Sequence, residues 1–246
     1  MARYQIILAY DGSELWGSQR QANRRTAQGE LENALRRLGW QGRSVLMAGR
    51  TDTGVHASGQ VAAFDLEWTH PLDEMAKALN GHLPVDVAVH AVKIVRDDFH
   101  PRFDALARRY RYRLYCQPAR DPLRERYLWR LWPAPQTETL QAAAQLLIGK
   151  HNFAAFGTPP RPASSTIRTV MKAEWQQQAD EWIFEVQADA FLYRMVRRMV
   201  YLLAAVGQGK LPVQAIADLL EGRPRVAPAG LAPAHGLTLV EVIYPE

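Results

Sequence analysis

Strand-like and helix-like patterns follow one another in the first hundred residues in an order that few folds accommodate. Residues 3–10 alternate in polarity, as a half-buried strand does, and the leucines of TAQGELENALRRLG at 26–39 have helical spacing. The remaining patterns of this half are strands at 45–48, 60–66 and 85–95 and a helix at 71–83. The order β-α-β-β-α-β is that of a ferredoxin-like split unit, which we therefore expect here.

The second half repeats this order coarsely, although the two halves share no visible sequence repeat. Its patterns predict strands at 107–116, 169–178, 182–189 and 237–244 and helices at 137–148, 191–206 and 213–220. Segments 117–136 and 157–168 are rich in proline and arginine and resemble long surface loops, which are often functional. We place the domain boundary between residues 104 and 105, giving domains of 1–104 and 105–246.

The composition indicates a water-soluble protein. Hydrophobic residues make up 48% and charged residues 22% of the chain, and the longest apolar run, Met199–Val206, is far short of the ~20 residues that cross a bilayer. A single cysteine, Cys116, cannot form an internal disulfide, which fits a reducing compartment, so we expect a cytoplasmic protein without a membrane partner. The net charge of +5, mostly from clustered arginines, suits a nucleic-acid partner or an ordinary solvated basic surface.

One carboxylate, Asp52, lies in the small and polar segment AGRTDTGVHASGQ at 48–60. Arg50 precedes it by two positions, and a nearby guanidinium would keep such a carboxylate ionised, as a nucleophile requires. The alternative is that Asp52 only caps a turn through its own backbone, and the local chemistry by itself favours that alternative. His56, four residues later, has no role that the sequence supports.

Arginines gather on one face of the predicted helix at 191–206. At 100° per residue Arg194, Arg197 and Arg198 fall opposite an apolar arc, and no acidic residue accompanies them. This face is either a solvated surface or a wall that faces an anion, and the absence of acids favours the wall. We take Arg194, Arg197 and Arg198 as candidate substrate-binding residues.

Arginine and tyrosine alternate in the predicted strand ALARRYRYRLYC at 105–116. Period two places Tyr110 and Tyr112 on one face and Arg109 and Arg111 on the other. Cations next to aromatic rings suit phosphate contact and base stacking, whereas the alternative is a two-sided edge strand. Neither face is plainly apolar, so the pattern favours ligand contact without identifying the face.

Several common chemistries have no support in the sequence. No Cys or His spacing for a metal is present, and no complete glycine-rich phosphate loop appears. Ser58 and His56 lack the strand–turn–helix setting of a nucleophile elbow. A glycosidase pair would need a second acid beside Asp52. We expect neither a metal nor a cofactor.

The segment GRTDTGVHASGQVAAF at 49–64 resembles the signature of the tRNA pseudouridine synthase A family. Further segments resemble that family in the same order: YDGSELWGSQRQ at 10–21, TAQGELENAL at 26–35, LNGHLP at 79–84, FHPRFDALARRYRYRLY at 99–115, HNFAAF at 151–156, IRTV at 167–170, FLYRMVRRMV at 191–200 and APAHGLTL at 232–239. The resemblance therefore runs nearly from end to end.

The resemblance implies isomerisation of uridine to pseudouridine at positions 38, 39 and 40 in the anticodon stem-loop of tRNA. It implies Asp52 as the nucleophile, attacking C6 of the uracil or C1′ of the ribose, with Arg50 and Arg197 as cationic partners. Tyr110 would stack on the base or assist proton transfer, and Leu237 would form part of an apolar pocket wall. No cofactor or metal is implied.

The resemblance also implies an α+β fold. Two ferredoxin-like halves would form one continuous, mostly antiparallel sheet with helices packed on it, with the active-site cleft between the halves. The protein would act as a homodimer on tRNA.

The chain departs from the family pattern at Ser18, Pro101 and Ala234 and over 157–166. These positions bear on loop contacts and site selection, because none coincides with Asp52 or its implied partners. Two alternatives remain: a catalytically silent RNA-binding module of RRM-like fold, and a hydrolase that acts on nucleosides.

Overall fold

The alternating pattern at the start of the chain forms strand β1 (Ala2–Tyr10) in the computed structural model, which describes residues 1–161, 164–223 and 230–245. β1 pairs antiparallel with β3 (His56–Leu66) on one side and with β4 (Val87–Val95) on the other. The short β2 (Leu46–Met47) extends this sheet by pairing with β3. The inward side chains of β1 are almost fully buried, so this sheet carries the core of the first half.

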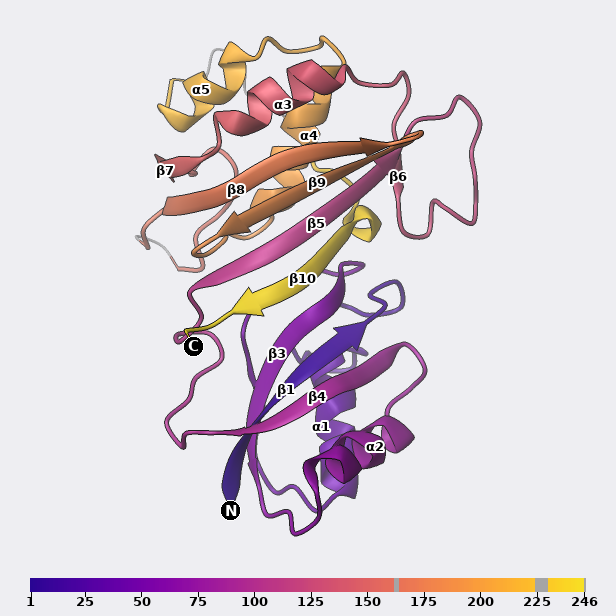
Figure 1. The fold of residues 1–246 in the computed structure, drawn as a ribbon, viewed down its shortest axis with the longest axis vertical. Coiled ribbons are helices and arrows are strands. Elements are labelled where there is room, and N and C mark those ends of the chain that lie inside the picture. Colours follow the sequence, from indigo (N-terminus) through magenta and orange to yellow (C-terminus); the bar gives the residue numbers. More distant parts are fainter. Residues whose placement is uncertain (162–163, 224–229, 246) are drawn as a thin grey trace. The chain divides into compact units, whose positions relative to one another are not determined.

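Two helices accompany these strands, as Figure 1 shows. Helix α1 (Ala27–Arg37) begins after Thr26, whose Oγ1 accepts a hydrogen bond from the Gly29 N–H at 3.2 Å. Helix α2 (Leu72–His82) packs against β4. The predicted β-α-β-β-α-β order of this half is confirmed, with its second strand only two residues long.

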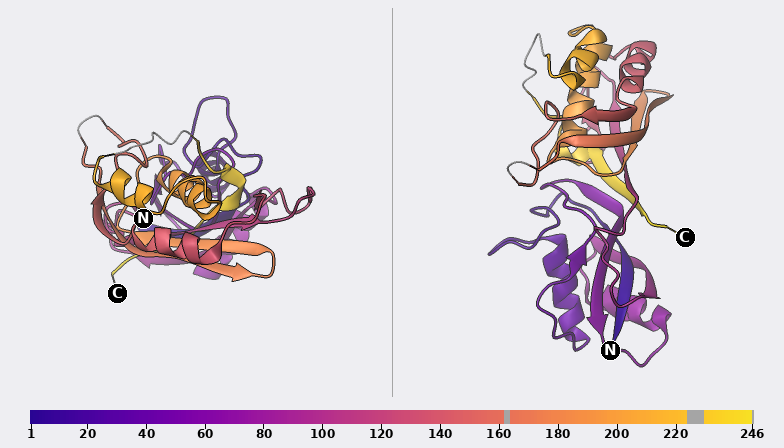
Figure 2. Two further views of the ribbon diagram at one scale, coloured as in Figure 1. Left: turned by 90° about the horizontal axis from the view of Figure 1, so that it is seen from above. Right: turned by 90° about the vertical axis from the view of Figure 1, so that its left-hand side faces the viewer.

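The second half is built on the antiparallel order β5-β9-β8-β7, and β6 pairs in parallel with β5. Its elements are β5 (Ala107–Tyr115), β6 (Trp129–Arg130), α3 (Thr137–Gln145), β7 (Gly149–Asn152), β8 (Ile167–Gln178), β9 (Glu181–Ala188), α4 (Met195–Gly207), α5 (Gln214–Leu220) and the 3₁₀ turn η1 (Ala234–Gly236). Helix α3 packs on β8 and α4. The right-hand view of Figure 2 shows the helices of this half, in pink and orange, above its strands. The predicted α+β class is confirmed.

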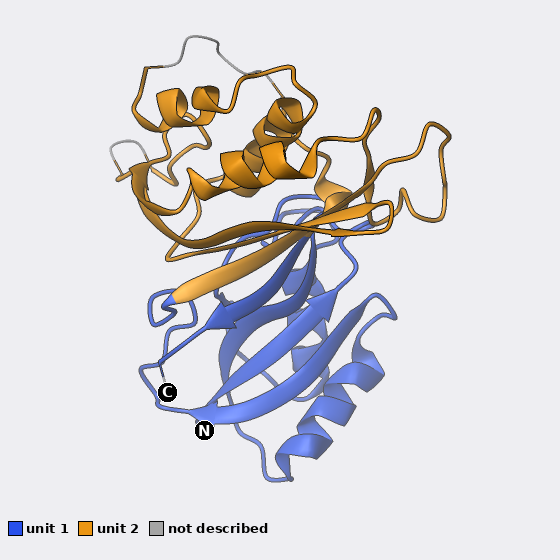
Figure 3. Ribbon diagram, turned by 45° about the horizontal axis from the view of Figure 1, so that its top comes forward, with its two compact units in different colours: residues 1–106, 238–246 blue, residues 107–237 orange. Residues whose placement is uncertain are grey.

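The last strand, β10 (Leu237–Ile243), returns to the first half of the chain. Thr238 and Leu239 pair in parallel with His56 and Ala57 of β3. The chain therefore divides into unit 1, Met1–Leu106 with Thr238–Glu246, and unit 2, Ala107–Leu237 (Figure 3). The division at 104 and 105 that the sequence suggests keeps the C-terminal strand with the second half, because no local pattern reveals which strand it pairs with.

The helix predicted at 191–206 is shorter at its start than its pattern indicates. Tyr193 and Thr158 form an isolated β-bridge, in which each main-chain N–H donates to the other's carbonyl. Arg194 then adopts a left-handed backbone with φ of 64°, and α4 begins only at Met195. Within the part of the chain that the structure describes, no helix combines the length and apolarity needed to cross a membrane.

Candidate active site

Asp52 lies on the loop between β2 and β3, which we call the motif loop (residues 48–55). The loop leaves β2 with a hydrogen bond from the Ala48 N–H to the Val61 carbonyl at 2.8 Å. It closes in a turn in which the Val55 N–H donates to the carbonyl of Asp52 at 3.1 Å. Asp52 is partly buried, whereas Arg50 on the same loop is exposed. The structure thus places both residues on one loop of unit 1.

Thr51, the residue before Asp52, is held through both its backbone and its side chain. Its N–H donates to Ser18 Oγ at 2.8 Å, and its carbonyl accepts from the Ser18 N–H at 3.1 Å. Its hydroxyl is hydrogen-bonded to the Tyr10 hydroxyl at 2.8 Å. Burial raises the pKa of Tyr10 although its hydrogen bonds oppose the shift, so this phenol stays protonated near neutral pH. The backbone that carries Asp52 is therefore fixed.

Two residues that the sequence left without a role support this arrangement. Ser18 is the partner of Thr51 just described. Gly17, with φ of +90°, lies so close to the loop that an added Cβ would stand 2.7 Å from the Thr51 carbonyl oxygen. A glycine is required here both for its backbone conformation and for this approach. Neither role could be predicted from a period-two or helical pattern, because both contacts join residues that are far apart in the sequence.

His56 also has a position that explains its place in the motif. It is buried at the start of β3, and its Nδ1 accepts a hydrogen bond from the Gly12 N–H at 3.0 Å. A carboxylate oxygen of Asp11 lies 3.2 Å from the same nitrogen. His56 thereby fastens the segment after β1 to the strand that follows the motif loop.

Tyr110 lies on β5 in unit 2 and is only 8% exposed. Its ring packs edge-to-face on Phe191, with centroids 5.0 Å apart. Tyr112 and Leu114 on the same face are fully buried, so this face belongs largely to the core of the protein. The burial of Tyr112 and Leu114 accounts for this face of the strand without a ligand, and contact of β5 with a ligand stays a prediction.

The opposite face of β5 is less positive than its sequence indicates. Arg111 pairs with Glu185 at 2.7 Å, and Arg113 pairs with Glu181 at 2.8 Å. These acids come from the neighbouring β9, which period-two reasoning on β5 alone does not include. Arginine-rich strands can thus be neutralised by their neighbours.

The three candidate arginines near α4 do not share one helix face. Arg194 precedes the helix, is exposed, and places its guanidinium 4.7 Å from the ring centre of Tyr193. Arg197 and Arg198 are half-buried within α4. The prediction of a single arginine wall over residues 194–198 is therefore wrong at Arg194, because the bridge at Tyr193 delays the helix.

Arg197 and Tyr112 hold the segment that leads to Leu237. Arg197 Nε donates to the Ala232 carbonyl at 2.8 Å, and the Tyr112 hydroxyl donates to the Pro233 carbonyl at 2.9 Å. Burial raises the pKa of Tyr112 well above its ordinary value, although the positive charge of Arg197 opposes the shift. Leu237 itself is buried directly after η1. Tyr112 is thus a supporting residue that the sequence did not single out.

No site for a metal ion is evident in residues 1–161, 164–223 and 230–245, where no three His, Cys, Asp or Glu side chains are grouped to hold one. Among the candidates, Asp52 and Arg50 lie in unit 1, and Tyr110, Arg194, Arg197, Arg198 and Leu237 lie in unit 2.

Comparison with known proteins covers nearly the whole chain. It is 41% identical over 247 residues to tRNA pseudouridine synthase A of Chloroflexus aurantiacus, covering 98% of this chain and 88% of the relative. The enzyme of that name from Methylacidiphilum infernorum is 42% identical, and the match covers 98% of this chain and 95% of the relative. The one from Syntrophomonas wolfei is 38% identical, and the match covers 100% of this chain and 99% of the relative. A solved Cbf5–Nop10–Gar1 complex is 13% identical with a TM-score of 0.43, covering 83% of this chain and 44% of that one, and is too distant to bear on fold or function.

The family model described as tRNA pseudouridine synthase matches residues 6–104 and 143–245, which include Asp52, Arg197 and Leu237. Tyr110 lies between the two matched segments. Both kinds of match confirm the resemblance of the sequence motifs: the chain belongs to the tRNA pseudouridine synthase family.

Proposed function

We propose that the chain isomerises uridine to pseudouridine in tRNA, with Asp52 as the nucleophile. The family match supports the reaction. The observation that supports the residue is the fastening of Thr51 to Ser18 and Tyr10, since it holds the adjacent carboxylate in one place. A positioned carboxylate can form a covalent intermediate at a small entropic cost.

The reaction balances without an external reagent. The bond between N1 of the uracil and C1′ of the ribose breaks, the uracil turns, and C5 bonds to C1′. The proton leaves C5, and N1 is protonated. Asp52 attacks either C6 of the uracil or C1′ and is regenerated at the end, so neither an oxidant nor a reductant is consumed.

Arg50 of unit 1 and several residues of unit 2 complete the proposal. Arg197 and Arg50 would be the cationic partners of Asp52, Tyr110 would stack on the base or assist proton transfer, and Leu237 would contribute an apolar wall. Arg194 and Arg198 would contact phosphates. The uridine must leave its stack to be reached, at a cost of a few kcal/mol that binding offsets.

The finer features of the proposal follow the family pattern. The target would be uridines 38, 39 and 40 of the anticodon stem-loop, and the active form would be a homodimer. We expect a protein that acts on tRNA to be cytoplasmic. This location suits the single cysteine, Cys116, which is buried and forms no disulfide.

Replacement of Asp52 by asparagine tests the proposal. The amide keeps the shape of the side chain but removes the nucleophile, so we expect pseudouridine formation to fall by at least about a thousandfold while tRNA affinity changes little. Pseudouridine is mapped in tRNA after incubation, and binding is measured in parallel. Turnover by Asp52→Asn near the rate of the unaltered protein would disprove the role of Asp52.

The two alternatives predict different results. A nucleoside hydrolase would release free uracil during the assay. A silent RNA-binding module would bind tRNA and leave every uridine unchanged; it is not favoured, because the relatives that match over the whole chain are named as synthases.

A further inference from the structure

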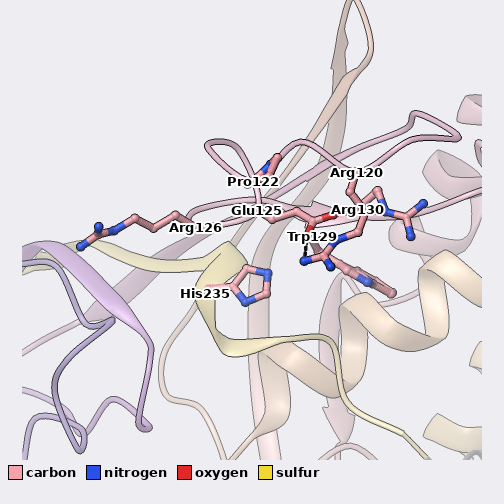
Figure 4. Close-up of a pocket in the computed structure, with 7 residues that line it drawn as sticks. All are labelled: Arg120, Pro122, Glu125, Arg126, Trp129, Arg130 and His235. Atoms are coloured by element: carbon pink, nitrogen blue, oxygen red, sulfur yellow. Dashed lines mark hydrogen bonds and ion pairs between the residues drawn. The ribbon is translucent and has the colours of Figure 1, made fainter.

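A cavity of about 560 Å³ lies in unit 2, at the base of the long loop that follows β5. Figure 4 shows the side chains that line it. They are Arg120, Pro122, Glu125, Arg126, Trp129, Arg130 and His235. The volume is in the ordinary range of ligand-binding sites, about 300–1,000 Å³. All but His235 lie in the stretch between the two segments that match the family model.

The loop that builds the cavity is held in place by its own framework. The Asp121 N–H donates to the Tyr115 hydroxyl at 2.9 Å, and the Leu131 N–H donates to the Tyr115 carbonyl at 2.9 Å. Arg124 forms ion pairs with Asp180 at 2.6 Å and Glu181 at 3.0 Å. Because the walls are fixed before any ligand arrives, little ordering cost remains for binding.

The charge of the cavity is positive. Among the seven described residues of the lining, Glu125 is the one carboxylate, and it pairs with both Arg120 at 3.0 Å and Arg130 at 3.2 Å. Arg126 is the third guanidinium of the lining. A shared carboxylate orients the guanidinium groups around it, and together they still carry excess positive charge. Such a group can donate charge-assisted hydrogen bonds to a phosphate oxygen.

The cavity also offers aromatic rings. Trp129 is partly buried, and its ring packs edge-on against Tyr112 with centroids 6.2 Å apart. His235 faces the same space from η1 (Figure 4). A fixed aromatic ring among guanidinium groups suits a nucleobase that carries its own phosphate, since every base has a face on which to stack.

We propose that this arginine–tryptophan pocket, lined by the seven residues named above, binds one nucleotide of the tRNA substrate away from the reacting uridine. Arg120, Arg126 and Arg130 contact phosphates, and Trp129 contacts the base. Arg120 and Arg130 lie together at Glu125, whereas Arg126 extends away from them (Figure 4), and this spacing suits more than one phosphate of a polymer better than one free nucleotide. The inference rests on the proposed function only in taking tRNA as the polyanion.

The test compares two double variants of the full chain. Arg120→Gln with Arg126→Gln removes two exposed charges of the pocket, and Arg37→Gln with Arg223→Gln removes two exposed charges elsewhere. We expect the pocket variant to bind a tRNA transcript about tenfold more weakly at ~0.1 M salt, and its slope of log K against log salt to fall by about 1–2. The control pair should stay within about twofold of the unaltered protein.

Three further readouts sharpen the test. Trp129→Leu should weaken tRNA binding with no change in the salt slope, and Trp129→Phe should restore most of the affinity because it keeps a ring. Phosphate-ethylation interference should show positions on the tRNA that matter for the unaltered protein and not for the pocket variant. Uridine monophosphate should compete with tRNA only at concentrations far above the Kd for tRNA.

The pocket inference is overturned if the pocket pair and the control pair show the same Kd and salt slope. It is equally overturned if uridine monophosphate binds as tightly as tRNA, which would make the pocket a mononucleotide site. Pseudouridine formation by the unaltered protein is measured with the same transcript. Its absence would reject the proposed function, whereas the binding comparison would still decide the pocket.

Discussion

The motif loop and the loop at 117–131, which we call the arginine loop, are fastened by different kinds of interaction. Thr51 of the motif loop is held by neutral hydrogen bonds to Ser18 and Tyr10, all of them buried. The arginine loop has neutral hydrogen bonds to the buried Tyr115 as well, but it depends in addition on the ion pair of Arg124 with Asp180, whose side chains are 22% and 37% exposed. The hydrogen bonds of Thr51 involve only groups that carry no charge, whereas part of the support of the arginine loop comes from charged groups that water and salt can reach.

The difference matches what each loop is proposed to do. Neutral buried hydrogen bonds respond little to ionic strength, so the hold on the Thr51 backbone next to Asp52 should change little with salt. Exposed ion pairs weaken as the salt concentration rises, because salt screens exposed charges over a length of about 8–10 Å near physiological ionic strength, but the same charges attract a polyanion. A loop that binds phosphates can therefore use ion pairs for support, whereas the backbone before the proposed nucleophile is supported by neutral hydrogen bonds at Thr51.

The largest effect on stability and activity should come from a methyl group added at Gly17, where the backbone lies close to the motif loop. Gly17→Ala places a Cβ 2.7 Å from the Thr51 carbonyl oxygen at a φ of +90°. We therefore expect the free energy of unfolding to fall by roughly 2–4 kcal/mol and kcat/KM to fall at least about tenfold. Gly39→Ala is the matched control, because Gly39 has φ of +89° and nothing within 4 Å of the added atom.

Gly39→Ala should show the backbone strain alone, roughly 1–2 kcal/mol, with unchanged activity. Denaturant unfolding and steady-state kinetics measure both. Equal losses in the two variants would mean that the approach of Gly17 to Thr51 does not matter, and the motif loop would then not be held as described.

A smaller effect should follow from Ser18→Ala. The variant leaves the Thr51 N–H without its 2.8 Å partner, so we expect a loss of roughly 1–3 kcal/mol that is the same at 0.1 and 1 M salt. Turnover should fall more than tRNA binding, because the loop carries the nucleophile. Ser58→Ala, at an exposed serine two residues beyond His56, is the control. A strong salt dependence of the Ser18→Ala loss would contradict the distinction between the loops.

The smallest effect should be a dependence on pH in the arginine loop. The Arg124 guanidinium lowers the pKa of Asp180 below its ordinary value. A lowered pKa in the folded state stabilises the protein above the unfolded value, about 3.9, and this stabilisation is lost as the pH falls further. The Tm difference between the unaltered protein and Asp180→Asn should therefore shrink from pH 5 to pH 3 and also in 1 M salt.

A Tm difference that is constant over this range of pH and salt would show that Asp180 supports the arginine loop through shape and neutral hydrogen bonds alone. The arginine loop would then be supported in the same way as the motif loop, which would contradict the difference between the two loops.

Features that depend on neighbours in the chain were predicted well. Thr26 is the N-cap of α1 because its hydroxyl meets an N–H three residues later, and β1 buries one side because alternate side chains of a strand point the same way. The motif around Asp52 identified the family for a related reason: its residue types are contiguous, and the family match includes them.

Features that depend on distant segments were not predictable. Arg194 leaves the helix because Tyr193 bridges to Thr158, and β10 joins unit 1 because it pairs with β3. The arginines of β5 are neutralised by acids of β9. In each case the deciding partner is far away in the sequence, so no local pattern contains it.

The sequence by itself determined the α+β class, the order of the elements, the family and the candidate nucleophile Asp52, because each is written in local periodicity or in a contiguous motif. Only the tertiary structure decided how Asp52 is supported, why Ser18 and His56 are present, and that Arg120, Trp129 and His235 line one cavity. These depend on backbone and side-chain groups brought together from remote positions, and their energies arise only once the chain has folded.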